Sequence, residues 1–245
     1  MFSFLKNHPF AVEAFFKYSV VLTFAFPKEQ LEHLIPECLT LDTLNDKWAF
    51  IAVALVQTKK LRPKGFPEFA GRDFTLIGYR VFVRYRNQAG KKLRGLYILK
   101  SETNKKSMQV LGNLFTRYSY TTTDISANEL DEKMIITSAQ SDFKIEIENH
   151  AAAALPLGSP FTDWKEARNF SGPLPFTFTY TPQTQEVLII EGIRENWIPK
   201  AIDVVDYHIP FLTVNGLENG ILANAFIIKD IPYWWKKGKT EQWTH

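Results

Sequence analysis

The sequence predicts a β-rich α+β fold, in which antiparallel strands form a shell around an enclosed interior and short helices lie outside it. Roughly ten segments are rich in β-branched and aromatic residues and are separated by turn residues, which is typical of an antiparallel β protein. No GxGxxG motif, phosphate-binding loop or βαβ alternation interrupts this series. The chain also contains 20 Phe, 9 Tyr and 6 Trp, side chains large enough to fill a wide interior or to line an apolar pocket.

The length of 245 residues is sufficient for one large domain. Surface scaling predicts that about 73% of the accessible surface of the chain is buried on folding, so the core needs no disulfide or metal. We therefore expect a single domain over residues 1–245. The only candidate domain boundary is the segment 151–160, which we interpret as an internal loop. The net charge of +3 is too small for a nucleic-acid-binding surface, which needs clustered basic residues.

The first quarter of the chain predicts two helices, two strands and a loop. Residues 9–18 have apolar side chains at helical spacing, which predicts a short helix. Residues 19–26 are rich in β-branched and aromatic side chains and predict a buried strand. Residues 27–36 predict a second helix with proline in its first turn. Residues 48–57 predict another buried strand, and the prolines and glycines of residues 58–71 predict a loop.

The same reasoning gives the remaining elements. Strands are predicted at residues 74–86, 93–100, 117–123, 133–140, 143–149, 174–181, 186–193, 203–208 and 220–228, and helices at 103–115 and 161–169. The turn that follows the first of these strands has Gly90 where a positive φ suits a hairpin. In the first of these helices, Met108, Leu111 and Phe115 form one apolar stripe.

The strand at residues 74–86 has two different faces, because side chains alternate along a strand. One face carries Tyr79, Val81, Val83 and Tyr85, and the other carries Arg80, Phe82, Arg84 and Arg86. An apolar face with a basic face behind it fits the wall of a shell. Which of the arginines points inward stays open.

The sequence predicts no metal site, cofactor or membrane span. Cys38 is the only cysteine, and no Cys/His cluster has the spacing of metal ligands. The apolar N-terminal segment is interrupted by Lys6, His8, Glu13 and Lys17. No small-residue cleavage site follows it, so we expect neither a signal peptide nor a span. A cytoplasmic location is the default expectation.

Three segments occur in an order that resembles a known superfamily. Residues 31–42 (LEHLIPECLTLD) have the form of a helix, a proline and a short strand that ends in aspartate. Residues 79–90 (YRVFVRYRNQAG) are similar to a strand and hairpin, and residues 96–120 to a strand, a helix and an active-site strand. Together they resemble the acetoacetate-decarboxylase-like superfamily, and more closely its uncharacterised YqjF-like branch, over most of residues 12–212. The resemblance implies an antiparallel double-barrel-like shell around a central cavity, with short peripheral helices.

The resemblance also implies a test of chemistry. The family's enzyme uses a lysine that forms a Schiff base with a β-keto acid, and this amine must be neutral near pH 7, which desolvation and a neighbouring cation achieve. In this sequence the two lysine positions fall on Ser119 and Tyr120, and the active-site glutamate falls near Leu76. The active-site arginine falls near Lys17. The pair Lys105–Lys106 lies too early in the chain, so we expect no Schiff-base decarboxylase.

Four further residues are candidates for a ligand site. Arg80 occupies the place of an arginine in the R-x-Y-V pattern of the YqjF-like branch. If it points inward it needs a carboxylate, for which Glu102 is the candidate, or an anionic ligand; a surface salt bridge is the alternative. Tyr118 and Tyr120 share one strand face, where they either bind a polar ligand group or cap the core. His208 is either structural or an acid/base contact.

Two functions follow from these residues. The first is a binding protein that keeps a cavity for a small-molecule ligand and has lost the lysine chemistry. The second is an enzyme on a small organic acid or carbonyl metabolite with other acid/base groups. The ligand-binding candidates are Lys17, Arg80, Glu102, Tyr118, Ser119, Tyr120 and His208. The aromatic and basic residues 233–245 form a tail that is either mobile and able to touch a partner or packed on the body. We expect a monomer or a homodimer.

Overall fold

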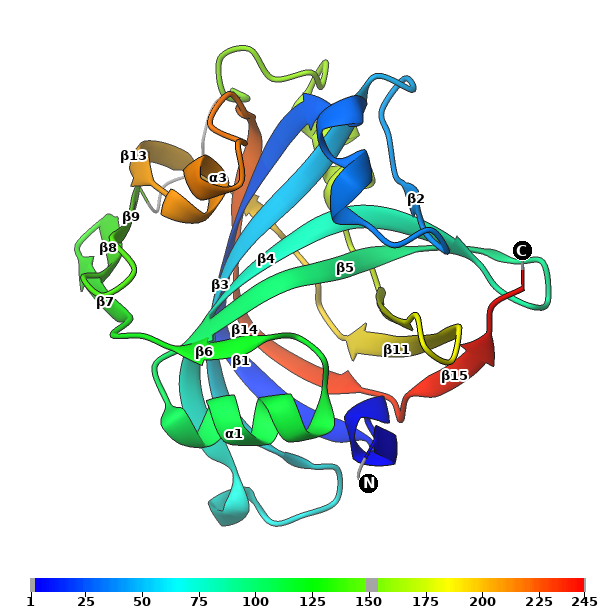
Figure 1. The fold of residues 1–245 in the computed structure, drawn as a ribbon. Coiled ribbons are helices and arrows are strands. Elements are labelled where there is room, and N and C mark those ends of the chain that lie inside the picture. The colour runs from blue at the N-terminus through cyan, green and yellow to red at the C-terminus, as the bar shows by residue number, and fades with distance from the viewer. Residues whose placement is uncertain (1–2, 149–153, 245) are drawn as a thin grey trace.

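The structure, a computed structural model, describes residues 3–148 and 154–244. Within these residues an 11-stranded sheet has the order β12-β14-β1-β3-β4-β5-β10-β11-β15, with β2 on β4 and β6 on β5. A 4-stranded sheet has the order β13-β9-β8-β7. Figure 1 shows the long strands β3, β4 and β5 side by side across the molecule, with α1 below them and the smaller sheet at one side.

The large sheet contains β1 (Val12–Pro27), β2 (Thr40–Leu41), β3 (Trp48–Pro63), β4 (Arg72–Arg86), β5 (Lys92–Thr103), β6 (Tyr120–Thr122), β10 (Phe176–Thr181), β11 (Glu186–Arg194), β12 (Lys200–Ala201), β14 (Ile221–Trp235) and β15 (Lys239–Gln242). The small sheet contains β7 (Ser126–Leu130), β8 (Lys133–Ser138), β9 (Phe143–Glu148) and β13 (Asp203–His208). The α-helices are α1 (Lys106–Phe115), α2 (Trp164–Ser171) and α3 (Pro210–Val214). The 3₁₀ turns are η1 (Ser3–Asn7), η2 (Lys28–Gln30), η3 (Glu32–Leu34) and η4 (Glu68–Ala70).

The strand path of the large sheet is closed by hydrogen bonds between β11 and β14, the strands next to its two ends. β10 runs parallel to β5 and antiparallel to β11. The end of β11 pairs with the end of β14, where Arg194 lies opposite Tyr233. Because β14 also pairs with β1, the strands β1, β3, β4, β5, β10, β11 and β14 form a continuous ring of pairings. Residues from both halves of the chain therefore face one another inside this ring.

The long strands bury a different set of side chains on each face. On one face, Tyr79 and Val81 of β4 join a core with residues of β8, β9 and α3, and Tyr79 stacks on Phe211 with ring centroids 4.1 Å apart. On the other face, Phe82 of β4 packs with Phe50 of β3 and with residues of α2. This separation follows directly from the alternation of side chains that the sequence of β4 predicts.

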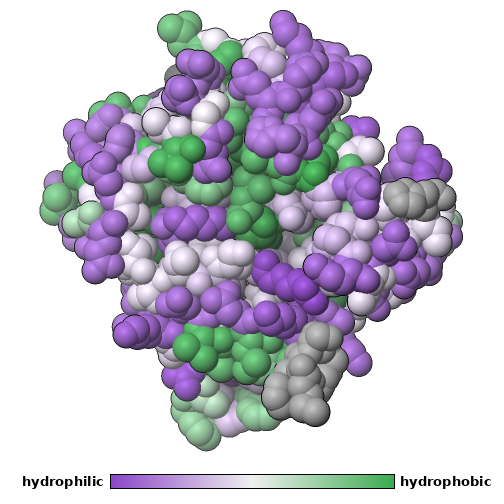
Figure 2. Space-filling view, viewed as in Figure 1, coloured by the Kyte–Doolittle hydropathy of each residue, from purple (hydrophilic) through white to green (hydrophobic). Residues whose placement is uncertain are grey.

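The short helices lie outside the large sheet, as the sequence predicts. The surface in Figure 2 is mostly hydrophilic, with one group of hydrophobic residues over α1 and another in the upper middle of the view. Val110 and Leu114 on the outer side of α1 are exposed, whereas Met108 is buried against Phe74 and Tyr120. Among the described residues, no helix is long and apolar enough to cross a membrane.

Two helices predicted near the N-terminus are wrong. Residues 12–18 form the start of β1, because this segment pairs with β3 on one side and β14 on the other, and these ladders outweigh its helical spacing. Within residues 27–36 the chain forms only the two 3₁₀ turns η2 and η3, and neither has a side-chain N-cap that would stabilise a longer helix.

Other boundaries also differ from the prediction. The loop predicted at residues 58–71 begins only after Pro63, where β3 ends. The polar strand β7 was not predicted, because its residues are all exposed and show no apolar alternation. Residues 149–153 lie outside the described residues, together with part of the loop predicted at 151–160 and the end of the strand predicted at 143–149.

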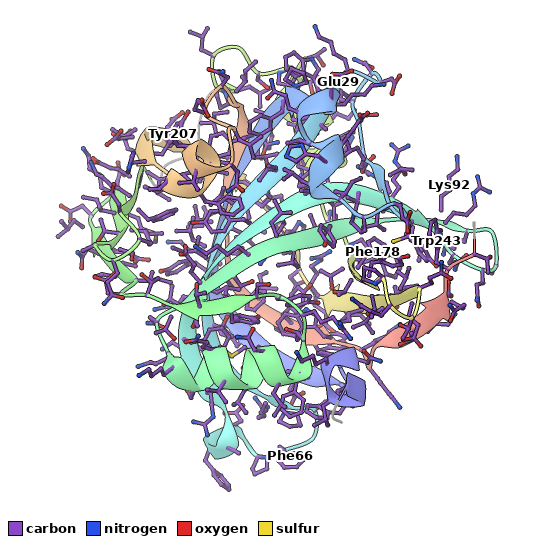
Figure 3. The ribbon with its side chains drawn as sticks, viewed as in Figure 1. Glu29, Phe66, Lys92, Phe178, Tyr207 and Trp243 are labelled. Carbon is purple, nitrogen blue, oxygen red and sulfur yellow. The ribbon has the colours of Figure 1, made fainter. Side chains whose placement is uncertain are left out.

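The C-terminal segment is paired in the large sheet. β14 extends to Trp235, and β15 pairs with β11. The rings of Tyr180 and Trp243 meet edge to face with centroids 5.8 Å apart. Figure 3 shows Trp243 in the same region as Lys92, at the β4–β5 turn. The sequence leaves open whether the tail at residues 233–245 is mobile or packed. In the described residues this segment packs on the rest of the protein.

Asp42 is a fully buried carboxylate that joins three strands. Its backbone N–H donates to the carbonyl of Phe82, and its carboxylate accepts from Nε of Arg84 and Nε of Arg94, each at 2.6 Å. Arg94 also donates to the carbonyl of Phe170 at 2.9 Å. Asp42 thereby fixes β2 to β4 and β5 and links β5 to α2.

Replacement of Asp42 by asparagine is expected to destabilise the protein by about 2 kcal/mol. Breaking a buried ion pair costs about 3–5 kcal/mol, and the partial exposure of both arginines reduces this value. Urea unfolding at pH 7 measures the change, with Asp46→Asn as the control, because Asp46 is an exposed carboxylate in a surface ion pair. An equal, small effect of both substitutions would contradict the role of Asp42.

Glu241 is expected to make stability depend on pH. Burial raises its pKa, but the Lys239 ammonium, the Gln88 N–H and the Tyr85 hydroxyl together hold the pKa below its ordinary value of 4.5. This stabilisation is present above pH 4.5 and is lost as the pH falls through the lowered pKa. Glu241→Gln is therefore expected to cost about 1 kcal/mol at pH 7, and the difference from the wild type should shrink in acid. A difference that is constant between pH 7 and pH 3 would contradict this prediction.

Candidate functional site

A pocket with a volume of about 430 Å³ lies on the α1 and α2 side of the long strands. Small side chains of β3 make room for it. Ala52 and Ala54 face the pocket, whereas the larger Ile51, Val53 and Leu55 alternate with them and face the opposite core. The alternation of small and large residues along one strand thus gives a packed core on one side and open volume on the other.

The polar lining of this pocket is basic. Four arginines line it, namely Arg62, Arg72, Arg80 and Arg194. Hydroxyl groups come from Ser19, Thr58, Ser101, Thr116, Tyr118, Tyr120, Ser171, Thr177 and Tyr233. Within the part of the chain that the structure describes, no aspartate, glutamate or lysine lines the pocket. The described residues also contain no group of three or more side chains that could hold a metal ion.

Arg80 lies on the face of β4 that looks into the pocket. Its guanidinium folds back over Gly78, where a Cβ atom would stand 3.0 Å from Nε. Nε is buried and has no hydrogen-bond partner in the described residues, and no carboxylate pairs with the guanidinium there. Burial lowers the pKa of Arg80, whereas Tyr233, Tyr120 and Tyr118 raise it. Arginine stays protonated in proteins, so the pocket contains an unpaired positive charge.

Arg194 brings a second guanidinium to the pocket from the end of β11. It stacks on the rings of Trp197 and Tyr233, with its central carbon 4.5 Å and 5.6 Å from the ring centroids. Its Nη2 atom is buried and has no hydrogen-bond partner in the described residues. Burial lowers the pKa of Arg194, and Arg194 in turn lowers that of Arg80. The two cations therefore repel each other across the pocket.

Tyr118 and Tyr120 are held in the pocket by the segment that follows α1. Asn113 of α1 accepts the N–H of Tyr120 at 2.8 Å and donates to its carbonyl at 2.9 Å. Ser119 between the tyrosines has a φ of +51°, and its side chain is exposed. The hydroxyls of Tyr118 and Thr177 are hydrogen bonded at 2.8 Å.

The tyrosine hydroxyls are protonated at neutral pH. Burial raises the pKa of Tyr120 to about 12, although Arg80 lowers it. Burial also raises the pKa of Tyr118, against the opposing hydrogen bond with Thr177. The tyrosines are therefore hydrogen-bond donors near pH 7 and poor proton acceptors.

Two further glycines make room for tyrosines of this site. A Cβ atom on Gly112 of α1 would lie 2.4 Å from the Tyr120 ring. A Cβ atom on Gly192 of β11 would lie 2.0 Å from the Tyr233 hydroxyl. Both positions therefore need glycine for the rings to lie where they do.

His8 lines the pocket from the N-terminal segment. Its backbone N–H donates to the carbonyl of Phe115 at 3.3 Å, and its carbonyl accepts from Gly238 at 2.9 Å. The imidazole is buried, and its Nδ1 has no hydrogen-bond partner in the described residues. Burial lowers the pKa of His8 from its ordinary value, so the ring is neutral at neutral pH.

Lys17 lies away from the pocket. It occupies a bulge of β1, where the register to β3 shifts between Phe16 and Tyr18, and its side chain forms a 2.9 Å ion pair with Asp230 on the surface. The bulge also shifts the alternation of β1, so that Phe16 and Ser19 both line the pocket. The expectation that Lys17 supplies a basic group in the cavity therefore does not agree with its position.

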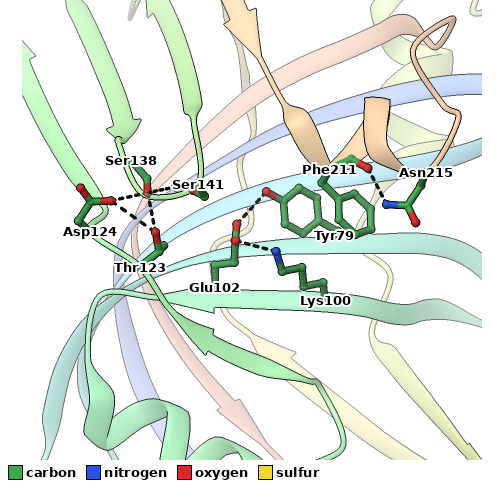
Figure 4. Close-up of polar contacts among 9 residues, drawn as sticks. All are labelled: Tyr79, Lys100, Glu102, Thr123, Asp124, Ser138, Ser141, Phe211 and Asn215. Carbon is green, nitrogen blue, oxygen red and sulfur yellow. Dashed lines mark hydrogen bonds and ion pairs between the residues drawn. The ribbon is translucent and has the colours of Figure 1, made fainter.

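Glu102 and His208 also lie elsewhere. Glu102 faces the opposite core, where it accepts from the Tyr79 hydroxyl at 2.9 Å and from Nζ of Lys100 at 2.8 Å (Figure 4). It therefore does not partner Arg80. His208 is exposed and lies 3.0 Å from a carboxylate oxygen of Asp142. Of the seven residues that the sequence suggests, the pocket contains only Arg80, Tyr118 and Tyr120.

The residues that sequence reasoning missed come from the two ends of the chain. His8, Arg194 and Tyr233 reach the pocket only because β11, β14 and the N-terminal segment meet in the closed ring of pairings. No local motif marks Arg194. For Tyr233 the sequence contained one signal, the aromatic run at residues 233–235, but we assigned this run to a C-terminal tail.

Solved structures place this fold in a recognised class. The chain is similar to an acetoacetate-decarboxylase-like enzyme from Sphingomonas wittichii RW1, with a TM-score of 0.60 and 11% identity over 98% of this chain and 96% of that one. It is similar to acetoacetate decarboxylase from Legionella pneumophila, with a TM-score of 0.63 and 10% identity over 95% and 88% of the two chains. The enduracididine biosynthesis enzyme MppR gives a TM-score of 0.58 and 8% identity over 96% and 88%. The protein therefore has an acetoacetate-decarboxylase-like fold.

The family is shown by the sequence. The model of the family DUF2071, described as an uncharacterized conserved protein, matches residues 15–224, and the chain belongs to this family. No curated protein matches the sequence.

Replacement of Arg80 by methionine is expected to stabilise the protein by about 1–2 kcal/mol in the absence of ligand, because an apolar chain of similar length removes an unpaired buried charge. Urea unfolding at pH 7 measures the change. Arg86→Met is the matched control, because Arg86 is an exposed arginine of the same strand, and we expect its effect to stay within about 0.5 kcal/mol. A loss of stability in Arg80→Met alone would show that Arg80 supports the fold through contacts of its own.

Proposed function

We propose that the protein binds a small organic anion in the pocket described above and that Arg80 is the main anchor of its negative charge. One observation carries this proposal: the two unpaired guanidinium groups of Arg80 and Arg194 face a pocket whose described lining contains no carboxylate.

The energetics of these charges support an anionic ligand. Two half-buried cations that repel each other cost free energy in the unliganded protein, and a carboxylate would relieve both their desolvation and their repulsion. Guanidinium groups bind carboxylates through two parallel hydrogen bonds, and the hydroxyls of Tyr118, Tyr120 and Tyr233 are further donors. A cation or a neutral molecule would leave the arginines unpaired.

The proposal also excludes Schiff-base decarboxylation as the chemistry of this pocket. A Schiff-base decarboxylase needs a desolvated lysine in its cavity, and among the described residues the lining contains none. The MppR enzyme of similar fold has been solved in complex with pyruvate, an organic acid. We take from this likeness only that a shell of this kind accommodates such a ligand, and we infer that here it is bound without a covalent step.

An enzyme with other acid/base groups is less well supported. Glu102 and His208 bond to partners outside the pocket, so of the acid/base candidates that the sequence suggests, such an enzyme would keep only Arg80, Tyr118 and Tyr120. The raised pKa values of both tyrosines make them donors rather than bases near pH 7. Binding is therefore the function that these groups support better.

We propose that the chain is a single domain and that its strands form a double-barrel-like shell around this cavity. It is supported by the continuous ring of strands, in which the N-terminal β1 and the C-terminal β14 are neighbours. The smaller sheet would cover the opposite face of the same strands.

The Arg80 anchor predicts a charge-dependent binding test. Thermal unfolding at pH 7 with pyruvate or hexanoate, at an ionic strength matched with chloride, should show stabilisation of the wild type and of Arg86→Met by at least one of the acids. Arg80→Met should bind that acid about 30-fold more weakly, which corresponds to the loss of about 2 kcal/mol for hydrogen bonds to a charged group. Stabilisation no greater than that by chloride would overturn the proposal.

The absence of Schiff-base chemistry predicts an unchanged mass. After incubation with acetoacetate or pyruvate and reduction by borohydride, the intact mass of the protein should equal that of the untreated chain, because no lysine amine meets the ligand in the pocket. A reduced adduct on any lysine would contradict this part of the proposal.

A further inference from the structure

The size of the pocket bears on the kind of anion that fits it, and this step rests on the proposed function. At about 30 Å³ for each non-hydrogen atom, the share of one water molecule in the liquid, a pocket of about 430 Å³ accommodates about 14 such atoms. Pyruvate and acetoacetate have about half that number or fewer. A small keto acid alone would therefore leave much of the pocket to water.

The walls of the remaining volume are apolar. The stripe of Met108, Leu111 and Phe115 on α1 forms one wall, next to Phe74 of β4. Water in such a space finds few hydrogen-bond partners, because buried water needs about three of them. Apolar ligand atoms are the favourable occupants of this space.

The opposite wall is apolar too, and its residues are small. Ala52 and Ala54 of β3 line the pocket beside Val21 of β1, which pairs with Ala54 in the register of the two strands. Phe82 and Phe226 close this part of the lining. The lining of the pocket thus combines the guanidinium groups of Arg80 and Arg194 with apolar side chains of β3 and α1.

We infer that the ligand is an amphipathic carboxylate, with its carboxylate between Arg80 and Arg194 and an aliphatic or aromatic body of about 8–12 carbons against Ala52, Ala54 and the apolar stripe of α1. The body replaces water along the apolar walls, and the carboxylate pairs with the guanidinium groups. Charge fixes one end of the ligand, and the length of the pocket limits the other.

The test is a titration of the full-length protein with straight-chain carboxylates of two to twelve carbons and with the matching primary alcohols, below their aggregation concentrations. Affinity should rise about 3- to 4-fold for each added CH₂ until the pocket is filled, because each buried CH₂ contributes that factor. Each alcohol should bind at least 10-fold more weakly than its carboxylate. The substitution Arg80→Met should remove this difference, and Arg86→Met should keep it.

A second variant measures the apolar end of the pocket separately. Ala54→Leu places a larger side chain in the volume beside α1, so the most tightly bound carboxylate should become shorter by about three or four carbons. Ala52→Val is the milder form of the same change, with a smaller shift expected, and it keeps the test valid if Ala54→Leu does not fold.

The outcomes separate the two proposals. If carboxylates of two to four carbons bind in an Arg80-dependent way and longer chains gain nothing, this inference is overturned and the proposed function stands. If carboxylates and alcohols of equal length bind alike, or if nothing in the series binds, the proposed function is overturned together with this inference. An optimum near ten carbons that shortens in Ala54→Leu supports both.

Discussion

The alternation of side chains along the long strands is the constraint on which the rest of the structure depends. Each of β1, β3, β4 and β5 contributes one face to a fully packed core and the other to the pocket. On β3 the alternation of Ala52 and Ala54 with larger residues leaves volume on one side only. On β4 it turns Arg80 toward the pocket while the neighbouring Tyr79 and Val81 stay in the opposite core. A charged site and an apolar core are thus built from the same strands, one residue apart.

β-Bulges interrupt this alternation of side chains. At these positions, the alternation in the sequence assigns side chains to the wrong face of the sheet. At the bulge of β1, Lys17 turns to the surface and the strand changes the face that it presents. The register of β4 and β5 shifts between Tyr79 and Arg80, and beyond this shift Lys100 and Glu102 both lie on the Tyr79 side. One extra residue moves a side chain to the other face of a sheet, and no pattern in a single sequence marks where it occurs.

Much of the fold could be predicted because the buried strands carry strong local signals. The β-branched and aromatic runs at residues 19–26 and 48–57 lie inside β1 and β3, and the hairpin glycine Gly90 has the positive φ that its turn requires. The helix expected at residues 9–18 failed because pairing on both sides of the strand is a tertiary effect. For the site, the alternation along β4 and the order of segments make Arg80 and the two tyrosines candidates, but they leave open which of the arginines points inward. Arg194 and Tyr233 do not, since only the pairing of β11 with β14 brings them to the pocket.

The strongest physical argument for a binding site is that glycines interrupt three elements around one pocket and that the same pocket contains an unpaired charge. Glycines interrupt β4, α1 and β11, and glycine inside a strand or helix costs about 0.5–1 kcal/mol relative to alanine. Each of them, Gly78, Gly112 and Gly192, leaves the space that Arg80, Tyr120 and Tyr233 occupy. The polar groups admitted at this cost are themselves unfavourable in the unliganded protein, because Arg80 has no anion to pair with in the described residues. A fold selected for stability alone would fill these positions with apolar side chains, so their joint presence indicates that the compensating interaction comes from a ligand.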